Sequence, residues 1–337
     1  MKTYVIAEVG PNHNGSFSLA LKYIDLIAKS GANAIKFQLA IPSDVYSSDS
    51  FKAKYQKKND GRRSIIEMSK KIQLSFNDHL KLSKYAKKKG LDYLCSAFDI
   101  QSLKFLVQEA RVKHIKIPSG EVFDLNTLNY ISKIKKKIFL STGMVTIKDL
   151  KNILNILNKN FKKKITILYC VSSYPARLEQ INFDNMLKLK KLGYSVGFSD
   201  HTISQNASLI AVALGAKVIE KHITINRKLR GPDHKFSLTI NEFKDLVSNI
   251  KEIEKLITIK KNKKFNTSSK EIINVSRKSI VSSRLIHKNT KISKNDIVFK
   301  RPGTGISPLK INKVLGKFSK IDIRPDKVIK LQMLKKS

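Results

Sequence analysis

Two apolar runs in the second half of the sequence end in polar side chains that could do chemistry. In YSVGFSDHTIS (194–204), Ser199 and His201 follow a run typical of a buried strand, and in AKVIEKHIT (216–224), His222 ends a second such run. Two neutral imidazoles without a neighbouring cysteine suit a divalent metal ion that keeps open coordination positions. We therefore expect His201 and His222 to hold a metal ion that acts as a Lewis acid, with general acid–base catalysis by a histidine as the alternative.

Two lysines in other apolar runs point to an anion site. Lys36 stands in AIKFQ (34–38), where alternation places it on one face with Gln38, and Lys116 stands in HIKIP (114–118). A lysine on a strand that is covered on both faces must pair with an anion or bear a large desolvation cost. Two or three of the hydroxyl groups at the ends of other runs could complete a cradle for phosphate and carboxylate, the candidates being Ser119, Ser141, Thr142, Ser172, Ser173 and Ser199.

The elements that must bring these residues together alternate along the chain. Short β-like runs and segments of helical periodicity, such as 18–32, 76–90 and 205–216, follow one another. This pattern predicts a (β/α)8 TIM barrel, in which chemistry lies at the carboxyl ends of the strands. A doubly wound open sheet is the alternative, but no glycine-rich nucleotide loop follows any of the runs. The eight runs lie at 4–10, 34–38, 91–98, 114–120, 137–143, 165–171, 195–201 and 217–223.

The pattern changes after the barrel. We expect the barrel domain to cover residues 1–256, a polar and basic linker to follow at 257–274, and a small separate domain with short β-like runs to cover 275–337. Within the barrel, the connection at 39–73 is unusually long, and we expect it to line or cover the site.

The composition excludes several classes of protein. The 337 residues carry a formal net charge of +40, but the lysines are scattered over the chain and no nucleic-acid-binding motif is present, so we expect no nucleic-acid partner. No apolar stretch is long enough for a membrane span, and the apolar run at 4–9 is too short for a signal peptide. With only Cys95 and Cys170, both in apolar contexts, a reducing cytoplasmic location is expected.

Several phrases, taken in order, resemble the sialic-acid synthase family. They are IAEVGPNHNGSFSLA, AIKFQ, KIPSGE, LSTGM, YPA, VGFSDHT, ALGAKVIEKHIT, GPDHKFSL and KRPGTGISP. The resemblance covers nearly the whole chain, and the tail resembles the antifreeze-like (SAF, β-clip) domain of this family. It implies a nonulosonic acid synthase, a transferase that condenses phosphoenolpyruvate with an N-acetylated mannosamine-type sugar, adds water and releases phosphate.

The same resemblance implies roles for individual residues. The metal ligands would be His201 and His222, holding Mn²⁺, with Mg²⁺ or Co²⁺ as alternatives. Phosphoenolpyruvate would bind Lys36, Gln38, Lys116, Ser119, Ser141 and Ser199. The sugar would bind Glu8, Tyr174, Asp233 and Arg301, and Arg301 would reach the partner's site in a domain-swapped homodimer. For the reaction so implied, we expect catalytic roles for Glu8, Lys36, Lys116, Glu121 and Tyr174, with Glu8 and Glu121 as candidates for orienting sugar hydroxyls or water.

Some questions stay open at the level of the sequence. The acceptor would be N-acetylmannosamine, giving N-acetylneuraminate, or 2,4-diacetamido-2,4,6-trideoxymannose, giving legionaminate; KAKYQKKN and KRPGTGISP resemble that branch rather than the pseudaminic-acid branch. The chain departs from the family pattern at Ser172, Cys95 and Ala97. Another phosphoenolpyruvate-dependent sugar-acid synthase and a basic nucleic-acid-binding protein remain the alternatives.

Overall fold

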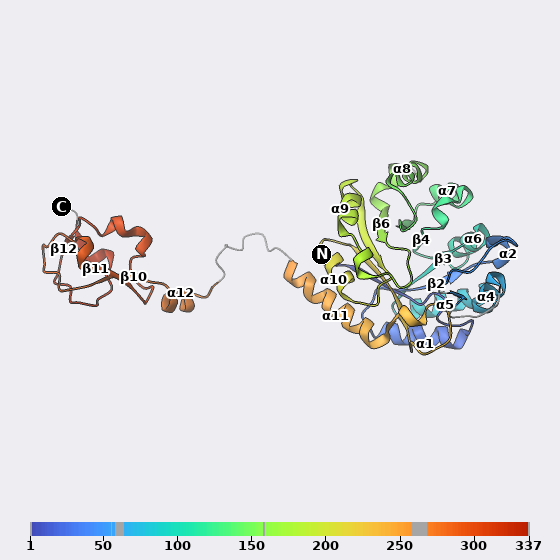
Figure 1. The fold of residues 1–337 in the computed structure, drawn as a ribbon, viewed down its shortest axis with the longest axis horizontal. Coiled ribbons are helices and arrows are strands. Elements are labelled where there is room, and N and C mark those ends of the chain that lie inside the picture. The colour runs from blue at the N-terminus through green and yellow to red at the C-terminus, as the bar shows by residue number, and fades with distance from the viewer. Residues whose placement is uncertain (1, 55, 58–63, 158, 258–267, 336–337) are drawn as a thin grey trace. The chain divides into compact units, whose positions relative to one another are not determined.

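The computed structural model of the chain describes residues 2–54, 56–57, 64–157, 159–257 and 268–335 (Figure 1). The chain divides into two compact units, Met1–Thr258 and Ile259–Ser337. Most of the linker expected at 257–274 lies outside the described residues, and in its described part Lys270–Ser276 forms helix α12.

The first unit is a closed barrel of parallel strands, as predicted. Each strand pairs with the next along the chain, and β1 also pairs with β8, which closes the ring. A two-residue strand, β9 (Leu238–Thr239), extends β8. The barrel strands are β1 (Tyr4–Glu8), β2 (Ala34–Leu39), β3 (Asp92–Ala97), β4 (His114–Ile117), β5 (Lys137–Ser141), β6 (Ile165–Cys170), β7 (Ser195–Asp200) and β8 (Val218–Thr224).

Helices surround the strands of this unit (Figure 1). Their starts follow from local sequence: Ser75 caps α5 and forms a capping box with Asp78, for example, which satisfies backbone N–H groups that the first turn leaves free. Within the described residues, none of the helices combines the length and apolar character needed to span a membrane. They are α1 (Phe17–Ala28), α5 (Phe76–Lys88), α6 (Ile100–Gln108), α7 (Leu125–Ser132), α8 (Ile147–Ile156), α9 (Phe183–Lys191), α10 (Asn206–Ala213) and α11 (Ile240–Ile257).

The long connection between β2 and β3 has structure of its own. It contains helices α2 (Pro42–Val45) and α4 (Ile65–Ile72). Tyr46, directly after α2, is half-buried, and its pKa is raised by burial and then by the charge of Glu121. Part of this connection therefore lies close to Glu121, which follows β4.

Alternation along the strands separates two layers of side chains. Outward-facing residues such as Ile35, Phe198 and Ile219 pack with the helices in one large apolar core. Inside the barrel, a smaller apolar cluster fills the layer below the site: Ile6, Ala34, Leu94, Phe139, Leu168 and Val218. Residues two positions further along these strands face inward in the next layer, and there the residue types become polar.

The register of the strands places the polar residues level with one another. Glu8 on β1 lies opposite Lys36 on β2 and opposite His222 on β8. Ser199 on β7 lies opposite Glu220 on β8. The sequence therefore forms one ring of inward-facing polar side chains at the carboxyl ends of strands that are far apart in the chain.

The second unit has a small core of its own. It contains antiparallel pairs of short strands, β10 (Ser279–Ser282) with β11 (Ile297–Lys300) and β12 (Phe318–Ser319) with β13 (Leu334–Lys335). Its apolar residues, among them Ile280, form a cluster separate from the barrel core. It is thus a small β domain, as the sequence predicted.

Candidate active site

A cluster of two lysines and two carboxylates lies inside the carboxyl end of the barrel. Lys36 Nζ is 2.8 Å from Glu220 Oε2 and 3.5 Å from Glu8 Oε2, and Lys116 Nζ is 3.4 Å from Glu220 Oε1. All four side chains are at most 4% exposed. Ionisable groups at this depth can carry charge only because they pair with one another.

The pKa values show how this pairing holds the charges. Burial raises the pKa of Glu220, but the charges of Lys116 and Lys36 outweigh burial and leave it well below its ordinary value. Burial likewise lowers the pKa of Lys36, and Glu220 and Glu8 outweigh it, so that this pKa is raised. For Lys116 burial prevails and the pKa is lowered, whereas burial raises the pKa of Glu8 to about 7. Glu220 is therefore the carboxylate that keeps its charge between the two lysines.

Hydroxyl and amide groups surround this cluster. Ser199 Oγ donates to Glu220 Oε1 at 2.8 Å, and Gln38 Nε2 donates to Glu8 Oε1 at 2.9 Å. Ser119 Oγ lies 3.2 Å from Ser172 Oγ. Ser141 Oγ is buried and has no hydrogen-bond partner among the described residues, which is rare for a buried hydroxyl and leaves it available to a ligand.

His201 and His222 lie beside each other at the same end of the barrel. Their ring centroids are 5.5 Å apart, with 67° between the ring planes. Nδ1 of His201 donates to the carbonyl oxygen of Val171 at 2.8 Å, so Nε2 is the ring nitrogen that would be available to a metal ion. A backbone carbonyl on the far ring nitrogen is the usual way to orient a metal-ligating histidine. Nδ1 of His222 is buried and lacks a hydrogen-bond partner among the described residues.

The environment of the two histidines fits a divalent metal ion. Burial lowers the pKa of His201 to about 4 and that of His222 well below its ordinary value, so both rings are neutral, the form that binds metals. Among the residues that the structure describes, no group of three or more His, Cys, Asp or Glu side chains is arranged to hold a metal ion. Two histidines alone would leave several coordination positions for water and substrate.

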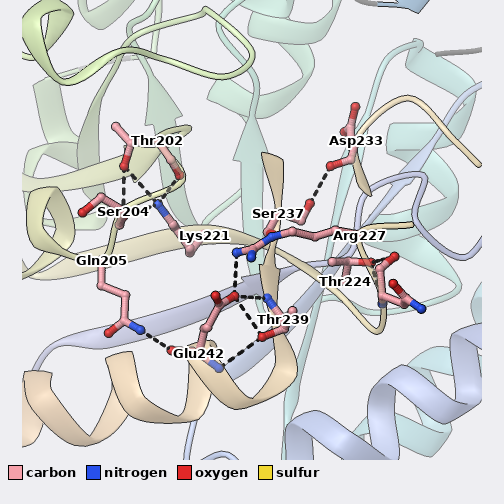
Figure 2. Close-up of polar contacts among 11 residues, drawn as sticks. Thr202, Ser204, Gln205, Lys221, Thr224, Arg227, Asp233, Ser237, Thr239 and Glu242 are labelled. Carbon is pink, nitrogen blue, oxygen red and sulfur yellow. Dashed lines mark hydrogen bonds and ion pairs between the residues drawn. The ribbon is translucent and has the colours of Figure 1, made fainter. Parts of the chain in front are cut away.

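Two of the expected sugar-binding residues lie against the histidines. The ring of Tyr174 is 4.3 Å from that of His201 and 6.0 Å from that of His222, measured between centroids. Asp233 Oδ2 is 3.6 Å from His222 Nδ1, and burial, followed by the charge of Glu8, raises the pKa of Asp233 to about 8. The backbone oxygen of Asp233 accepts a hydrogen bond from Ser237 Oγ, which holds the loop in place (Figure 2).

Gly10, in the turn after β1, lies close to the side chains of Glu8 and Asp233. Gly10 has a φ of +52°, in the region that favours glycine. A Cβ at Gly10 would lie 3.1 Å from Gln38 Nε2 and 3.2 Å from Glu8 Oε1. Both the backbone conformation and the crowding therefore disfavour a side chain at this position in the turn after β1.

Among the residues it describes, the structure does not join two of the predicted site residues, Glu121 and Arg301, to the lysine–carboxylate cluster. Glu121 lies on the short helix η1 (Glu121–Phe123), where burial raises its pKa to about 7, followed by the charges of Asp124 and Asp99. Within the described part of the chain, no hydrogen bond or ion pair joins Glu121 to Lys36, Lys116 or Glu220. Arg301 belongs to the second unit, in which it is exposed.

Glu220 is the residue that the sequence prediction left out of the site. It contacts three of the expected phosphoenolpyruvate ligands, namely Lys36, Lys116 and Ser199. The signal was present in VIEKHIT: Glu220 and His222 are two positions apart on one strand and therefore face the same side. Alternation alone would have placed Glu220 inside the barrel with His222.

Taken together, these groups can bind an anion beside a Lewis-acid site. The two ammonium groups and the free Ser141 hydroxyl are suited to phosphate and carboxylate oxygens. The paired imidazoles, Tyr174 and the acidic groups of Glu8 and Asp233 are suited to a metal ion and a polyhydroxylated partner. Two substrates held side by side in this way could react with each other.

Comparisons with known proteins agree with this geometry. Residues 23–262 match the NeuB family and residues 277–335 match the SAF domain. The chain is 41% identical over 335 residues to the N,N'-diacetyllegionaminic acid synthase of Campylobacter jejuni, covering 98% of this chain and 99% of that protein. It is 35% identical to the N,N'-diacetyllegionaminic acid synthase of Legionella pneumophila, covering 94% and 90%.

Solved structures agree as well. The crystal structure of N-acetylneuraminic acid (sialic acid) synthetase from Leptospira borgpetersenii in complex with citrate has a TM-score of 0.72 and 29% identity, covering 81% of this chain and 90% of that one. Enzymes of the NeuB family generally use a divalent metal ion. The chain therefore belongs to the NeuB family of phosphoenolpyruvate-dependent nonulosonic acid synthases, and it carries the C-terminal SAF domain.

Proposed function

We propose that this chain condenses phosphoenolpyruvate with 2,4-diacetamido-2,4,6-trideoxymannose and water to form N,N'-diacetyllegionaminate and phosphate. The observation that carries the proposal is the lysine–carboxylate cluster of Lys36, Lys116 and Glu220, which lies in the same barrel end as the His201–His222 pair. The choice of sugar rests on the two relatives that are named as synthases of this product. N-acetylmannosamine is the alternative acceptor.

The lysine–carboxylate cluster supports a phosphoenolpyruvate site on this side of the barrel end. Lys36 and Lys116 bind the phosphate and carboxylate of this substrate through charge-assisted hydrogen bonds. The hydroxyl groups of Ser119, Ser141 and Ser199 and the amide of Gln38 complete the shell. In this arrangement the lysines also stabilise the phosphate as it leaves, because they are already in place and need no reorganisation.

The other half of the site holds the open-chain sugar. Glu8, Tyr174 and Asp233 orient its hydroxyl groups, and His201 and His222 hold a divalent ion, which we propose is Mn²⁺. When bound, this ion supplies Lewis-acid polarisation of the aldehyde. Glu121, on the rim, orients water or a sugar hydroxyl.

The atoms of the reaction balance as follows. C3 of phosphoenolpyruvate forms a bond to the aldehyde carbon, whose oxygen takes up a proton and becomes a hydroxyl. Water adds to C2 and loses one proton, which balances the proton taken up by the aldehyde oxygen. The bond between C2 and the phosphate oxygen then breaks, its electron pair and the second proton of the water leave with phosphate, and the water oxygen remains as the ketone oxygen of the product. Alignment of the two substrates in one pocket contributes at most about 7–11 kcal/mol to lowering the barrier.

The second unit completes the sugar site in this proposal. We assign the active species as a domain-swapped homodimer in which Arg301 of the partner subunit contacts the N-acetyl group of the sugar. In its own unit Arg301 is exposed, as a residue that reaches another subunit must be. The RPG turn that carries it, 301–303, lies in the part of the chain that matches the SAF domain.

The deciding experiment measures phosphate release and identifies the product by mass spectrometry. The purified protein is incubated with phosphoenolpyruvate, Mn²⁺ and, in separate reactions, the 2,4-diacetamido sugar, N-acetylmannosamine and its 6-phosphate. We expect the highest kcat/KM with the 2,4-diacetamido sugar, loss of activity with chelator and recovery with added Mn²⁺. A higher kcat/KM with N-acetylmannosamine would reassign the acceptor, and no turnover with any sugar would refute the proposed activity.

A further inference from the structure

A buried ion pair lies directly behind the two histidines, on the outer face of the barrel wall. Asp200 on β7 and Lys221 on β8 are direct neighbours in the register. Lys221 Nζ is 2.8 Å from Asp200 Oδ2, and the two side chains are 1% and 0% exposed. Each member of the pair adjoins a histidine in sequence, Asp200 before His201 and Lys221 before His222.

The ion pair interrupts an apolar row. On β8, the outward positions on either side of Lys221 are Ile219 and Ile223, and both pack in the large core between strands and helices. On β7, Phe198 occupies the outward position before Asp200 and packs in the same core. Apolar residues would satisfy the packing here, and a buried ion pair often contributes no net stability relative to them. The ion pair between Asp200 and Lys221 is therefore better explained by a role in fixing the register of β7 and β8 than by a role in stabilising the fold.

Lys221 ties down the segment that carries His201. Its Nζ donates to the backbone oxygen of Thr202 at 2.5 Å and to the backbone oxygen of Ser204 at 2.9 Å (Figure 2). These residues follow His201 directly. The strand that carries His222 therefore contacts the chain on both sides of His201, at Asp200 before it and at Thr202 and Ser204 after it.

Asp200 anchors the same segment from the other side. Its Oδ1 accepts the backbone N–H of Thr202 at 2.8 Å, and its Oδ2 accepts the hydroxyl of Ser208 on α10 at 2.6 Å. The backbone oxygen of His201 in turn accepts the N–H of Ala176, in the loop that carries Tyr174. The position of His201, and with it that of Tyr174, depends on this network.

From this geometry we propose that Asp200 and Lys221 are positioning residues that set the separation and orientation of His201 and His222 for the divalent metal ion. The pair touches neither substrate nor metal, and it acts by locking one histidine-bearing turn to the neighbouring histidine-bearing strand. The inference rests on the proposed metal site.

The test replaces the pair as a unit. The double variant Asp200→Leu/Lys221→Met removes both charges, so neither is left buried and unpaired, and folding should be retained. Binding of Mn²⁺ alone is measured by electron paramagnetic resonance, and unfolding by urea is measured in the same buffer. We expect Mn²⁺ affinity to fall by about 10–100-fold, the usual effect of removing partners that orient metal ligands, with little change in the unfolding midpoint. The spectrum of bound Mn²⁺ should broaden as its coordination becomes less uniform.

A second ion pair in the same region provides the control. Arg227 and Glu242 form an ion pair at 2.6 Å that joins the segment after β8 to the start of α11 (Figure 2). Within the described residues, no hydrogen bond or ion pair joins either of them to His201 or His222. The variant Arg227→Met/Glu242→Gln should bind Mn²⁺ as the unmodified protein does. Equal Mn²⁺ affinity and an unchanged spectrum in the Asp200→Leu/Lys221→Met variant would overturn the inference.

A milder change guards against a variant that does not fold. Lys221→Arg keeps the positive charge beside Asp200, and we expect it to retain more Mn²⁺ affinity than Lys221→Met. Equal loss in both variants would overturn the role of the ion pair. His222→Ala separates the inference from the proposed function: Mn²⁺ binding that depends on His222 without turnover of any sugar would refute only the function, whereas Mn²⁺ binding that is independent of His222 would refute the metal site and the inference with it.

Discussion

At the scale of single residues, Glu220 is the centre of the proposed anion site. Its carboxylate binds Lys36, Lys116 and Ser199 at once, and it remains charged although it is fully buried. A negative charge in a site for an anionic substrate repels that substrate. Its presence is explained if it holds the two ammonium groups at a fixed spacing before phosphoenolpyruvate arrives.

We predict that Glu220→Gln raises the KM for phosphoenolpyruvate about tenfold or more, equivalent to at least about 1.4 kcal/mol of lost binding. The amide cannot pair with both lysines, so their ammonium groups lose the shared partner that positions them. Steady-state kinetics at saturating sugar measures the effect, with Glu109→Gln, an exposed carboxylate after α6, as the control. Tighter binding of phosphoenolpyruvate by Glu220→Gln would show that the charge acts only by repulsion.

At the scale of elements, the packing of α5 on the barrel depends on a buried histidine. His79 is fully buried on α5, and its Nδ1 lies 2.6 Å from the hydroxyl of Tyr93 on β3. Burial lowers the pKa of His79 to about 4. The folded protein therefore keeps this imidazole neutral at pH values where an exposed histidine is protonated.

The sign of the resulting pH dependence follows from proton binding. Between about pH 6.5 and pH 4 the unfolded chain binds a proton at His79 and the folded chain does not, so the free energy of unfolding decreases as the pH falls through this window. The slope from this one residue approaches about 1.4 kcal/mol per pH unit. Above pH 7 the contribution is fully present and independent of pH.

We predict that His79→Asn, which cannot take up a proton, makes this part of the pH dependence disappear. Urea unfolding of both proteins at pH 7, 6 and 5 measures it, and the other buried histidines act as a common background because they are present in both. The unmodified protein should lose more stability than the variant between pH 7 and pH 5. Parallel pH profiles for the two proteins would contradict the burial of a neutral imidazole between α5 and β3.

At the scale of the whole molecule, our proposal requires the SAF domain of the other subunit to complete the sugar site. We predict that Arg301→Ala mainly raises the KM for the sugar, because the site loses a contact with the N-acetyl group and keeps its phosphoenolpyruvate and metal ligands. Steady-state kinetics with each substrate varied in turn measures it. An unchanged KM for the sugar would contradict the role of Arg301.

Mixing Arg301→Ala, which should have little activity at low sugar concentration, with the inactive His222→Ala tests whether Arg301 acts across the dimer. Arg301→Ala keeps the histidines, and His222→Ala keeps the arginine, so a hybrid dimer contains one complete site if Arg301 acts in trans. After random exchange of subunits, activity at low sugar concentration should recover to about a quarter of the original, because half of the dimers are hybrid and each has one working site. No recovery in demonstrably mixed dimers would place Arg301 in its own subunit's site or outside any site.

The barrel itself could be predicted from the sequence because its signals are local. Each strand and helix shows its own periodicity, and the alternation in AIKFQ and VIEKHIT depends only on neighbouring residues. The polar residues at the ends of the runs were visible for the same reason. These local patterns also placed the small β domain after the barrel.

Only the tertiary structure decided which of these residues meet. Lys36 pairs with Glu220 because closure of the ring sets β1 between β2 and β8, with Glu8 level with both Lys36 and His222. The ion pair between Asp200 and Lys221 likewise depends on how β7 and β8 align. The absence, within the described residues, of a hydrogen bond or ion pair between Glu121 and the two lysines depends in turn on where the end of β4 lies. A side chain's face is a property of its own strand, whereas its partner depends on the register between strands, which no single stretch of sequence encodes.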